Sequence, residues 1–115
     1  MSRVGGDRLR GNLDLLVLAV LREGPGHGYD VGQRLQQKSS GAFDLHQGSL
    51  YPSLYRLEQA KLLASRWEKG DGGPRRRVYR LTAKGERALG GERQEWRSLV
   101  EAVTAVIGPD PAETT

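Results

Sequence analysis

The spacing of the apolar residues changes from a helical to an alternating pattern at Leu63, and no other feature of the sequence constrains the fold as much. Upstream, apolar residues recur at intervals of three and four positions, which is the spacing of one helix face. Residues 63–69 and 75–81 alternate instead, and the glycine-rich stretch Gly70–Pro74 lies between them. Two alternating runs around such a turn predict a β-hairpin.

Three helices are predicted before the hairpin. Residues 9–22 would be apolar over most of a helix surface, so this helix should be central and buried, and Gly24 and Pro25 should end it. A shorter helix is predicted over residues 27–39, with the apolar positions Tyr29, Val31 and Leu35. The clearest pattern lies in residues 47–62, where leucines follow one another at intervals of four and three residues: Leu50, Leu54 and Leu57.

In this third helix Ser49 is the predicted N-cap, and Pro52 is expected in the first turn, where a missing N–H costs little.

A last helix is predicted after the hairpin, from a cap at Thr82 to Ile107. Its apolar residues have the spacing of a helix that pairs with another helix: Leu89, Trp96, Leu99, Val103 and Val106, with Val100 and Ile107 widening the stripe. The pair Gly90–Gly91 interrupts it, and because each glycine costs up to about 1 kcal/mol relative to alanine, a kink or break is expected near residue 90.

Length and composition favour one small domain. A chain of 115 residues buries enough surface for a single core. It contains no cysteine, which excludes disulfides and thiolate metal sites and favours a reducing compartment. The longest apolar run, residues 15–21, is too short to cross a membrane, and no signal peptide is recognisable at the start. We therefore expect a cytoplasmic protein, with polar, frayed segments at 1–8 and 108–115.

The positive charge is concentrated in the middle of the chain. Residues 1–46 carry a net charge of +1, residues 47–84 carry +6 and residues 85–115 carry −3. Such a central basic block predicts a surface that binds a polyanion. A solvated surface with arginine-rich turns is the alternative that composition leaves open.

Three helices followed by a hairpin are the order of elements in a winged helix-turn-helix. The sequence therefore predicts a mainly α fold with a small β-hairpin, in which residues 9–81 form the DNA-binding domain and residues 82–107 form a helix that pairs with another helix. That this last helix is a dimerisation helix is what the family resemblance described next implies. A major groove about 12 Å wide admits one helix, and cationic side chains neutralise phosphates. The tip of the hairpin carries the candidates for the phosphate contacts: Lys69, Arg75, Arg76 and Arg77.

Four motifs in register support this prediction. They are L-x-L-L-V-L-A-V-L at 13–21, G-P-G-H-G-Y-D-V at 24–31, G-S-L-Y-P-S-L-Y-R-L-E at 48–58 and R-R-R-V-Y-R-L-T-A-K-G at 75–85. Through them the chain resembles the PadR-like family of bacterial transcriptional regulators, and its short C-terminal part is similar to the subfamily with a single long dimerisation helix. The resemblance implies a homodimer joined by its last helices and, in many members, repression that a small molecule relieves.

The family resemblance also implies which residues contact double-stranded DNA. Besides the four cations of the hairpin tip, the third helix supplies Gln47, Gly48, Ser49, Tyr51, Pro52, Tyr55 and Arg56. Ser49 stands where many members have threonine, which keeps a hydroxyl group. The alternative for Tyr51 and Tyr55 is partly buried packing. The second helix would support the third helix or contact the DNA backbone through His27, Tyr29 and Arg34.

The remaining aromatic residues and histidines have mainly structural interpretations. Trp67 is expected in the core or covering the hairpin, and Tyr79 is expected to close the hairpin onto the core. Trp96 is expected to pack in the dimer seam, and the alternative is contact with a small planar aromatic effector, which the resemblance implies. His27 and His46 have no cysteine partners, so neither a metal site nor a cofactor is expected.

The predicted function is a homodimeric, sequence-specific transcriptional regulator, most simply a repressor, that binds an inverted-repeat operator with half-sites about 34 Å apart. The chain has no phosphate-binding loop, dinucleotide fingerprint or nucleophile motif, so an enzyme is not expected. The alternative is an effector-sensing or protein-interaction module on a winged-helix scaffold. Strong salt dependence of binding would favour DNA over a protein partner.

Overall fold

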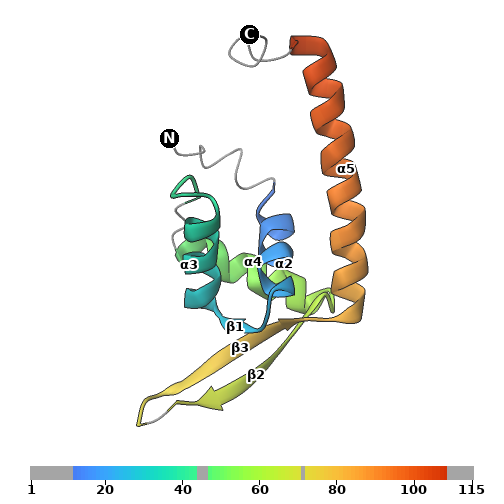
Figure 1. Cartoon of the computed structure of the whole chain (residues 1–115). Helices are drawn as coiled ribbons and strands as arrows, with labels where there is room; N and C mark the ends of the chain where they lie inside the picture. The colour runs from blue at the N-terminus through green and yellow to red at the C-terminus, as the bar shows by residue number, and fades with distance from the viewer. Residues whose placement is uncertain (1–11, 44–46, 71, 109–115) are drawn as a thin grey trace.

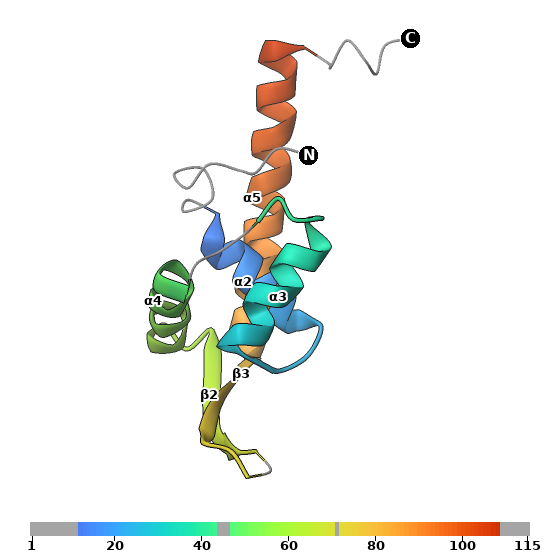
Figure 2. The ribbon, with the colours of Figure 1, turned by 90° about the vertical axis from the view of Figure 1, so that its left-hand side faces the viewer.

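The computed structural model describes residues 12–43, 47–70 and 72–108. The elements follow in the order α2 (Leu13–Arg22), β1 (Gly26–His27), α3 (Gly28–Lys38), α4 (Gln47–Gln59), β2 (Leu63–Lys69), β3 (Arg75–Leu81) and α5 (Ala83–Ile107). Helices α2, α3 and α4 form a helical head, and the β2–β3 hairpin, here called the wing, extends from one end of it (Figure 1). Helix α5 begins at the base of the wing, runs beside α2 and extends beyond the opposite end of the head, as Figure 2 also shows. The predicted fold class, a winged helix-turn-helix followed by one long helix, is confirmed.

Helix α2 is central, as its apolar sequence predicts. It packs against α3, α4, α5 and β3, because it has apolar residues on nearly every side. The core that it shares with α3 and α4 consists of residues at most 4% exposed, among them Val17, Leu18, Val31, Leu35, Leu50, Leu54 and Leu57. The leucine pattern of the third predicted helix therefore marks its buried face, and the opposite face of α4 is left for solvent.

The sheet has three strands in the order β1-β3-β2, all antiparallel. The bounds of β2 and β3 are those that the alternating pattern predicts. Strand β1 was not predicted, because two residues are too short to display a period. It pairs Gly26 with Tyr79 and His27 with Val78, so the segment that leads into α3 is hydrogen-bonded to the base of the wing.

Helix α4 departs from its predicted bounds at both ends. It already includes Gln47, so the prediction that Ser49 is its N-cap is wrong, and Pro52 lies inside the helix instead of in its first turn. The helix ends at Gln59 and not at residue 62. Lys61 takes a left-handed conformation with φ of 67°, and this turn directs the chain into β2.

Helix α5 begins at the base of the wing. The hydroxyl of Thr82 accepts a hydrogen bond from the N–H of Gly85 at 2.9 Å and donates one to the carbonyl of Lys61 at 2.7 Å. Gly85 packs so closely on the start of β2 that a Cβ atom would lie 2.1 Å from the carbonyl oxygen of Leu62. The first turn of α5 is thus fixed to the head and the wing together.

Beyond this docked turn, α5 projects into solvent as one continuous helix. The break expected at Gly90–Gly91 is absent, since the helix runs to Ile107. Leu89 is 1% exposed and belongs to the core around α2, so its predicted place in a dimer seam is wrong. Every residue from Gly90 to Ile107 is exposed. The predicted frayed segments fall outside the described residues, except for Gly108.

Candidate nucleic-acid interface

Helix α4 presents a continuous exposed face opposite its leucines. The predicted DNA-contacting residues on it are all exposed: Ser49, Tyr51, Pro52, Tyr55 and Arg56. The surroundings of the side chain of Gln47, and of Gly48, lie outside what the structure describes. A helix that buries one face in the head and leaves the other uncovered can enter a groove of DNA while its contacts with the head stay intact.

Tyr51 is packed against the head and is also partly exposed. Its ring lies against Gly28, where a Cβ atom would be 2.6 Å from Tyr51 Cε1, and yet the residue is 43% exposed. Glycine at the first position of α3 permits this close contact between the two helices. Tyr55 is 63% exposed and is free to contact a ligand.

Arg56 is held by a residue that the sequence did not single out. Its Nη2 atom lies 3.0 Å from Oδ1 of Asp14 on α2. The same oxygen accepts a hydrogen bond of 2.5 Å from the hydroxyl of Ser53, which is fully buried. Ser53 and Arg56 lie 39 and 42 positions after Asp14 in the sequence, and nothing in the local sequence pattern indicates these contacts.

The wing is braced against the end of α4 by Arg77. Its Nε donates to the hydroxyl of Ser65 at 2.7 Å, and its Nη2 lies 3.2 Å from Glu58 of α4. The Ser65 hydroxyl in turn donates to Glu58. The guanidinium also lies 5.5 Å from the ring centroid of Trp67, a cation–π contact. These contacts hold Arg77 against α4 while its side chain stays 44% exposed, and its predicted contact with DNA stays a prediction. Glu58 and Ser65, which hold it, are residues that sequence reasoning missed.

Trp67 was expected either in the core or covering the hairpin, and the structure excludes the core. It is 55% exposed on the wing, beside Arg77. Tyr79 is 7% exposed and belongs to the core, which confirms that it closes the wing onto the head. Burial raises the pKa of its hydroxyl above 10.0. The wing thus has an apolar base and a polar outer part.

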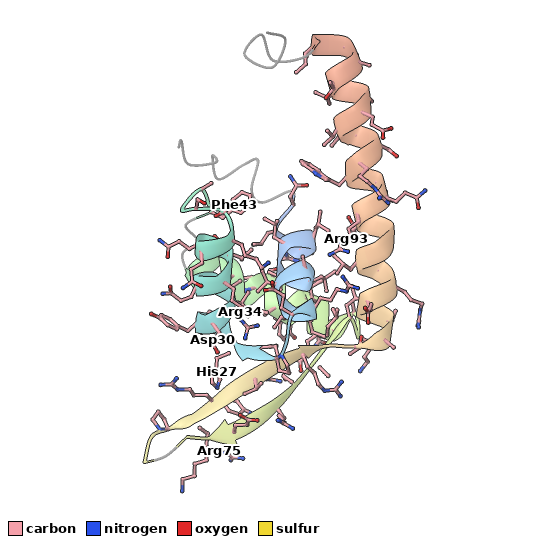
Figure 3. All side chains as sticks on the ribbon, in the orientation of Figure 1. His27, Asp30, Arg34, Phe43, Arg75 and Arg93 are labelled. Carbon is pink, nitrogen blue, oxygen red and sulfur yellow. The ribbon has the colours of Figure 1, made fainter. Side chains whose placement is uncertain are left out.

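Three cations near the wing tip remain available for an anion. Lys69, Arg75 and Arg76 are exposed, and within the described part of the chain none of them forms an ion pair. Figure 3 shows Arg75 near the tip, away from the head. These side chains differ from Arg77, although the sequence places Arg75, Arg76 and Arg77 in one run.

A hollow of about 630 Å³ separates the wing from the start of α3 and from α4. Aromatic rings and guanidinium groups line it together: Tyr29, Tyr51, Trp67, Tyr79, Arg75, Arg76 and Arg77, with His27 and Gly28. Tyr29, an apolar position of the second predicted helix, is 60% exposed and faces this hollow. Cations beside flat apolar rings suit the phosphates and sugars of a nucleic-acid backbone.

The start of α3 is organised by its own polar residues (Figure 3). The N–H of His27 donates to Asp30 Oδ2 at 2.9 Å, and His27 Nδ1 lies 2.9 Å from the same oxygen. Arg34 donates to the carbonyls of Gly24 and Pro25 at 2.7 and 2.9 Å. Arg34 and His27 therefore hold the segment that contains β1, and the predicted direct support of α4 comes instead from Gly28, through its contact with Tyr51.

We expect the contact at His27 to make folding stability depend on acid. The backbone hydrogen bond from His27 lowers the pKa of Asp30 below its ordinary value of 3.8, against the opposing effect of partial burial. A lowered folded-state pKa gives stability that is present above pH 4 and lost as the pH falls through the folded-state pKa. Because Asp30 is 41% exposed, solvent screens the contact, and Asp30→Asn should cost only about 0.5 kcal/mol at pH 7. Urea titrations should show that the free energy of unfolding changes less between pH 7 and pH 3 in the variant than in the wild type. Equal changes in the two proteins would contradict the expectation.

A second cavity, of about 890 Å³, lies between α2, α3 and α5. Leu16, Ala19 and Phe43 contribute apolar lining, and Arg93 lies on the side of α5 toward α2 (Figure 3). Above it, α5 presents a stripe of exposed apolar side chains, each 42–86% exposed: Trp96, Leu99, Val100, Val103, Val106 and Ile107. An uncovered apolar stripe of this length marks an interaction site.

The described residues contain no group of three or more acidic, histidine or cysteine side chains that could hold a metal ion. None of the helices described is both long and apolar enough to cross a membrane.

Known proteins share the sequence pattern and the fold. Residues 17–91 match the family described as "Transcriptional regulator PadR-like family". The transcriptional regulator Rv3488 of Mycobacterium tuberculosis is 41% identical over 73 residues, which cover 64% of this chain and 64% of that protein. Three other curated relatives are spanned by this chain over 92%, 26% and 50% of their lengths.

Among solved structures, a PadR family regulator from Eggerthella lenta has a TM-score of 0.77 and 33% identity, covering 90% of this chain and 88% of that chain. Bacillus subtilis PadR in complex with operator DNA has a TM-score of 0.63 and 23% identity, covering 69% of this chain and 45% of that chain. The similarity to the second structure is one of fold.

Proposed function

The chain belongs to the PadR-like family of transcriptional regulators, and from this premise we propose that it acts as a homodimeric repressor of sequence-specific operators. In this proposal α4 enters the major groove, and the wing follows the adjacent DNA backbone. Because its partner is the chromosome, we expect the protein in the cytoplasm.

The observation that carries the proposal is that α4 and the wing expose different kinds of side chain. The exposed face of α4 presents polar and aromatic side chains, which suit base edges. The wing tip presents Lys69, Arg75 and Arg76, three exposed cations that form no ion pair with any residue the structure describes. Phosphate contacts fix the register of a protein on DNA, and base contacts give specificity. The fold shared with Bacillus subtilis PadR, whose structure is a complex with operator DNA, supports binding to DNA.

The homodimer is proposed from the exposed stripe of α5. A second copy is the occupant that would cover six apolar residues on an otherwise solvated helix. Two-fold symmetry then requires an inverted-repeat operator, with half-sites about one helical turn, roughly 34 Å, apart. Trp96, 44% exposed within this stripe, is the proposed contact for a small planar aromatic effector that relieves repression.

The proposed function is tested by selecting bound duplexes from random and genomic fragments at a defined salt concentration, followed by footprinting. We expect an inverted repeat that is protected on one face of the DNA at both half-sites. Enrichment of no sequence over the starting pool would contradict specific recognition.

The unpaired cations should govern the salt dependence of binding. Each phosphate contact contributes about 0.9 to the slope of log K against log salt concentration. Removing Arg75 and Arg76 by alanine substitution should therefore flatten the slope by about 1.8 per subunit and weaken binding to every duplex alike. The slope is measured by fluorescence anisotropy between about 50 and 200 mM salt.

The matched control removes two other exposed arginines, Arg87 and Arg97 of α5, so the change in net charge is the same. This control should keep the wild-type slope. An unchanged slope in the Arg75→Ala, Arg76→Ala variant would place the wing away from the DNA.

A further inference from the structure

Asp14 connects the buried core to the exposed face of α4. It lies in the first turn of α2, outside both the groove-facing helix and the wing. Its Oδ1 atom accepts from the hydroxyl of Ser53 at 2.5 Å and lies 3.0 Å from Nη2 of Arg56. Ser53 is completely buried, whereas the side chain of Arg56 is 57% exposed. A fixed hydroxyl thus orients a carboxylate, and the carboxylate orients an exposed guanidinium.

This arrangement leaves Arg56 able to bind DNA in one orientation. A guanidinium has five N–H donors in a rigid fork, and among the described residues Asp14 engages it at one nitrogen. The remaining donors are available for the paired acceptors on a guanine edge, which arginine contacts bidentately. Because the side chain is already held, less conformational entropy is lost when it binds.

The negative charge of Asp14 has a second effect. Its side chain is 46% exposed, so it repels phosphates brought close to α4 in any complex. In a specific complex a well-placed contact from Arg56 compensates for this repulsion. In a non-specific complex, where Arg56 finds no matching base, the repulsion is uncompensated.

We propose that Asp14 is a specificity-determining residue for DNA: it holds Arg56 toward a base edge and disfavours complexes in which that contact is not made. The proposal rests on the proposed function. Stability does not explain why Asp14 also holds Arg56, because exposed ion pairs contribute little to folding. The Asp14–Arg56 pair also differs from the Arg22–Glu86 pair, which joins α2 to α5 at 3.1 Å, because only Asp14 is anchored by a buried hydroxyl.

The test compares Asp14→Asn with the matched control Glu86→Gln. Both variants remove one negative charge from a half-exposed acid–arginine pair of similar geometry, so they change the net charge equally. Dissociation constants of the full chain are measured for the selected operator and for a scrambled duplex of equal length. We expect Asp14→Asn to tighten binding to the scrambled duplex and to lower the discrimination ratio tenfold or more. Glu86→Gln should shift both constants by the same factor.

Two further variants separate positioning from charge. Ser53→Ala removes the anchoring hydroxyl but keeps both charges, and it should lower the discrimination ratio without tightening non-specific binding. Arg56→Lys keeps the charge but loses the fork, and it should remove most of the effect of a subsequent Asp14→Asn substitution. Thermal melting of each variant confirms that it is folded, so the inference does not depend on any single substitution.

Three results would overturn the inference. An unchanged ratio in folded Asp14→Asn would do so, as would an equal loss in Glu86→Gln, which would reduce the effect to net charge. A wild-type protein that selects no sequence would overturn the proposed function and this inference with it, whereas a selective wild type with an unaffected Asp14→Asn would overturn the inference alone.

Discussion

Replacing Val103 by aspartate should convert the proposed dimer into a monomer that no longer binds its operator. Val103 lies within the apolar stripe of α5 and is 43% exposed in the single chain. Covering it with a second copy would bury an unpaired carboxylate, which costs several kcal/mol. Because the two half-sites are then bound separately, operator affinity should fall by about 10²–10⁴-fold. Sedimentation at micromolar protein concentration and operator titration measure the two effects.

The control for this experiment adds the same charge elsewhere on the same helix. Ser98 lies away from the stripe, on a shallow polar surface with Gln94 and Glu95. Ser98→Asp should remain dimeric and keep its operator affinity within a few-fold. If Val103→Asp still sedimented as a dimer, the two copies would have to meet through a surface other than the stripe.

The second large effect is expected from Gly85→Ala, at the base of the wing. The new Cβ would lie 2.1 Å from the carbonyl oxygen of Leu62 and 2.7 Å from Leu81 Cδ1. The oxygen belongs to the backbone just before β2 and accepts hydrogen bonds from Thr82, so it cannot move alone. We expect a loss of about 3 kcal/mol in the free energy of unfolding, which corresponds to a melting temperature lower by roughly 10 °C.

Two other glycines in α5 provide the matched comparison. No heavy atom outside the local helix lies within 4 Å of the Cβ position at Gly90 or Gly91. Alanine at either position should therefore stabilise the helix by up to about 1 kcal/mol. Urea denaturation of the three variants decides the matter, and a Gly85→Ala protein as stable as the wild type would mean that α5 does not dock on the start of β2.

The sequence predicted the parts of this fold that have a period. The bounds of the wing strands agree with prediction because alternation begins and ends sharply at a glycine-rich turn. The leucines of α4 were correctly assigned to the core for the same reason. Strand β1 escaped prediction because its two residues have no period, and its pairing with β3 depends on residues about 50 positions away.

Spacing also cannot say which partner an apolar residue will contact. Leu89 fits the same helical stripe as Trp96, yet Leu89 lies in its own core and Trp96 is 44% exposed. The difference arises where α5 passes the end of α2, which is a property of three-dimensional packing. Spacing also did not show that Tyr29 and Trp67 line the hollow beside the wing, because a large aromatic residue in an element can face a hollow as readily as a core.

Charge patterns located the candidate interface but not the state of each cation. Arg77 belongs to the same run as Arg75 and Arg76, but Glu58, 19 residues away, holds it. Asp14 holds Arg56 across 42 residues. Composition counts all these arginines alike, and only the folded chain shows which of them a carboxylate holds in place and which form no ion pair among the described residues.

The adjacent glycines of α5 stand where the helix leaves the protein's core. Leu89 is the last buried residue of α5, and Gly90 and Gly91 follow it directly with open space around them. Glycine is the residue whose helical conformation is least favoured after proline. The exposed part of α5 therefore bends most easily at Gly90 and Gly91, where it leaves the core. In the proposed dimer, each winged unit can swivel on a stiff seam, and operators that differ by a base pair in half-site separation remain within reach of one protein.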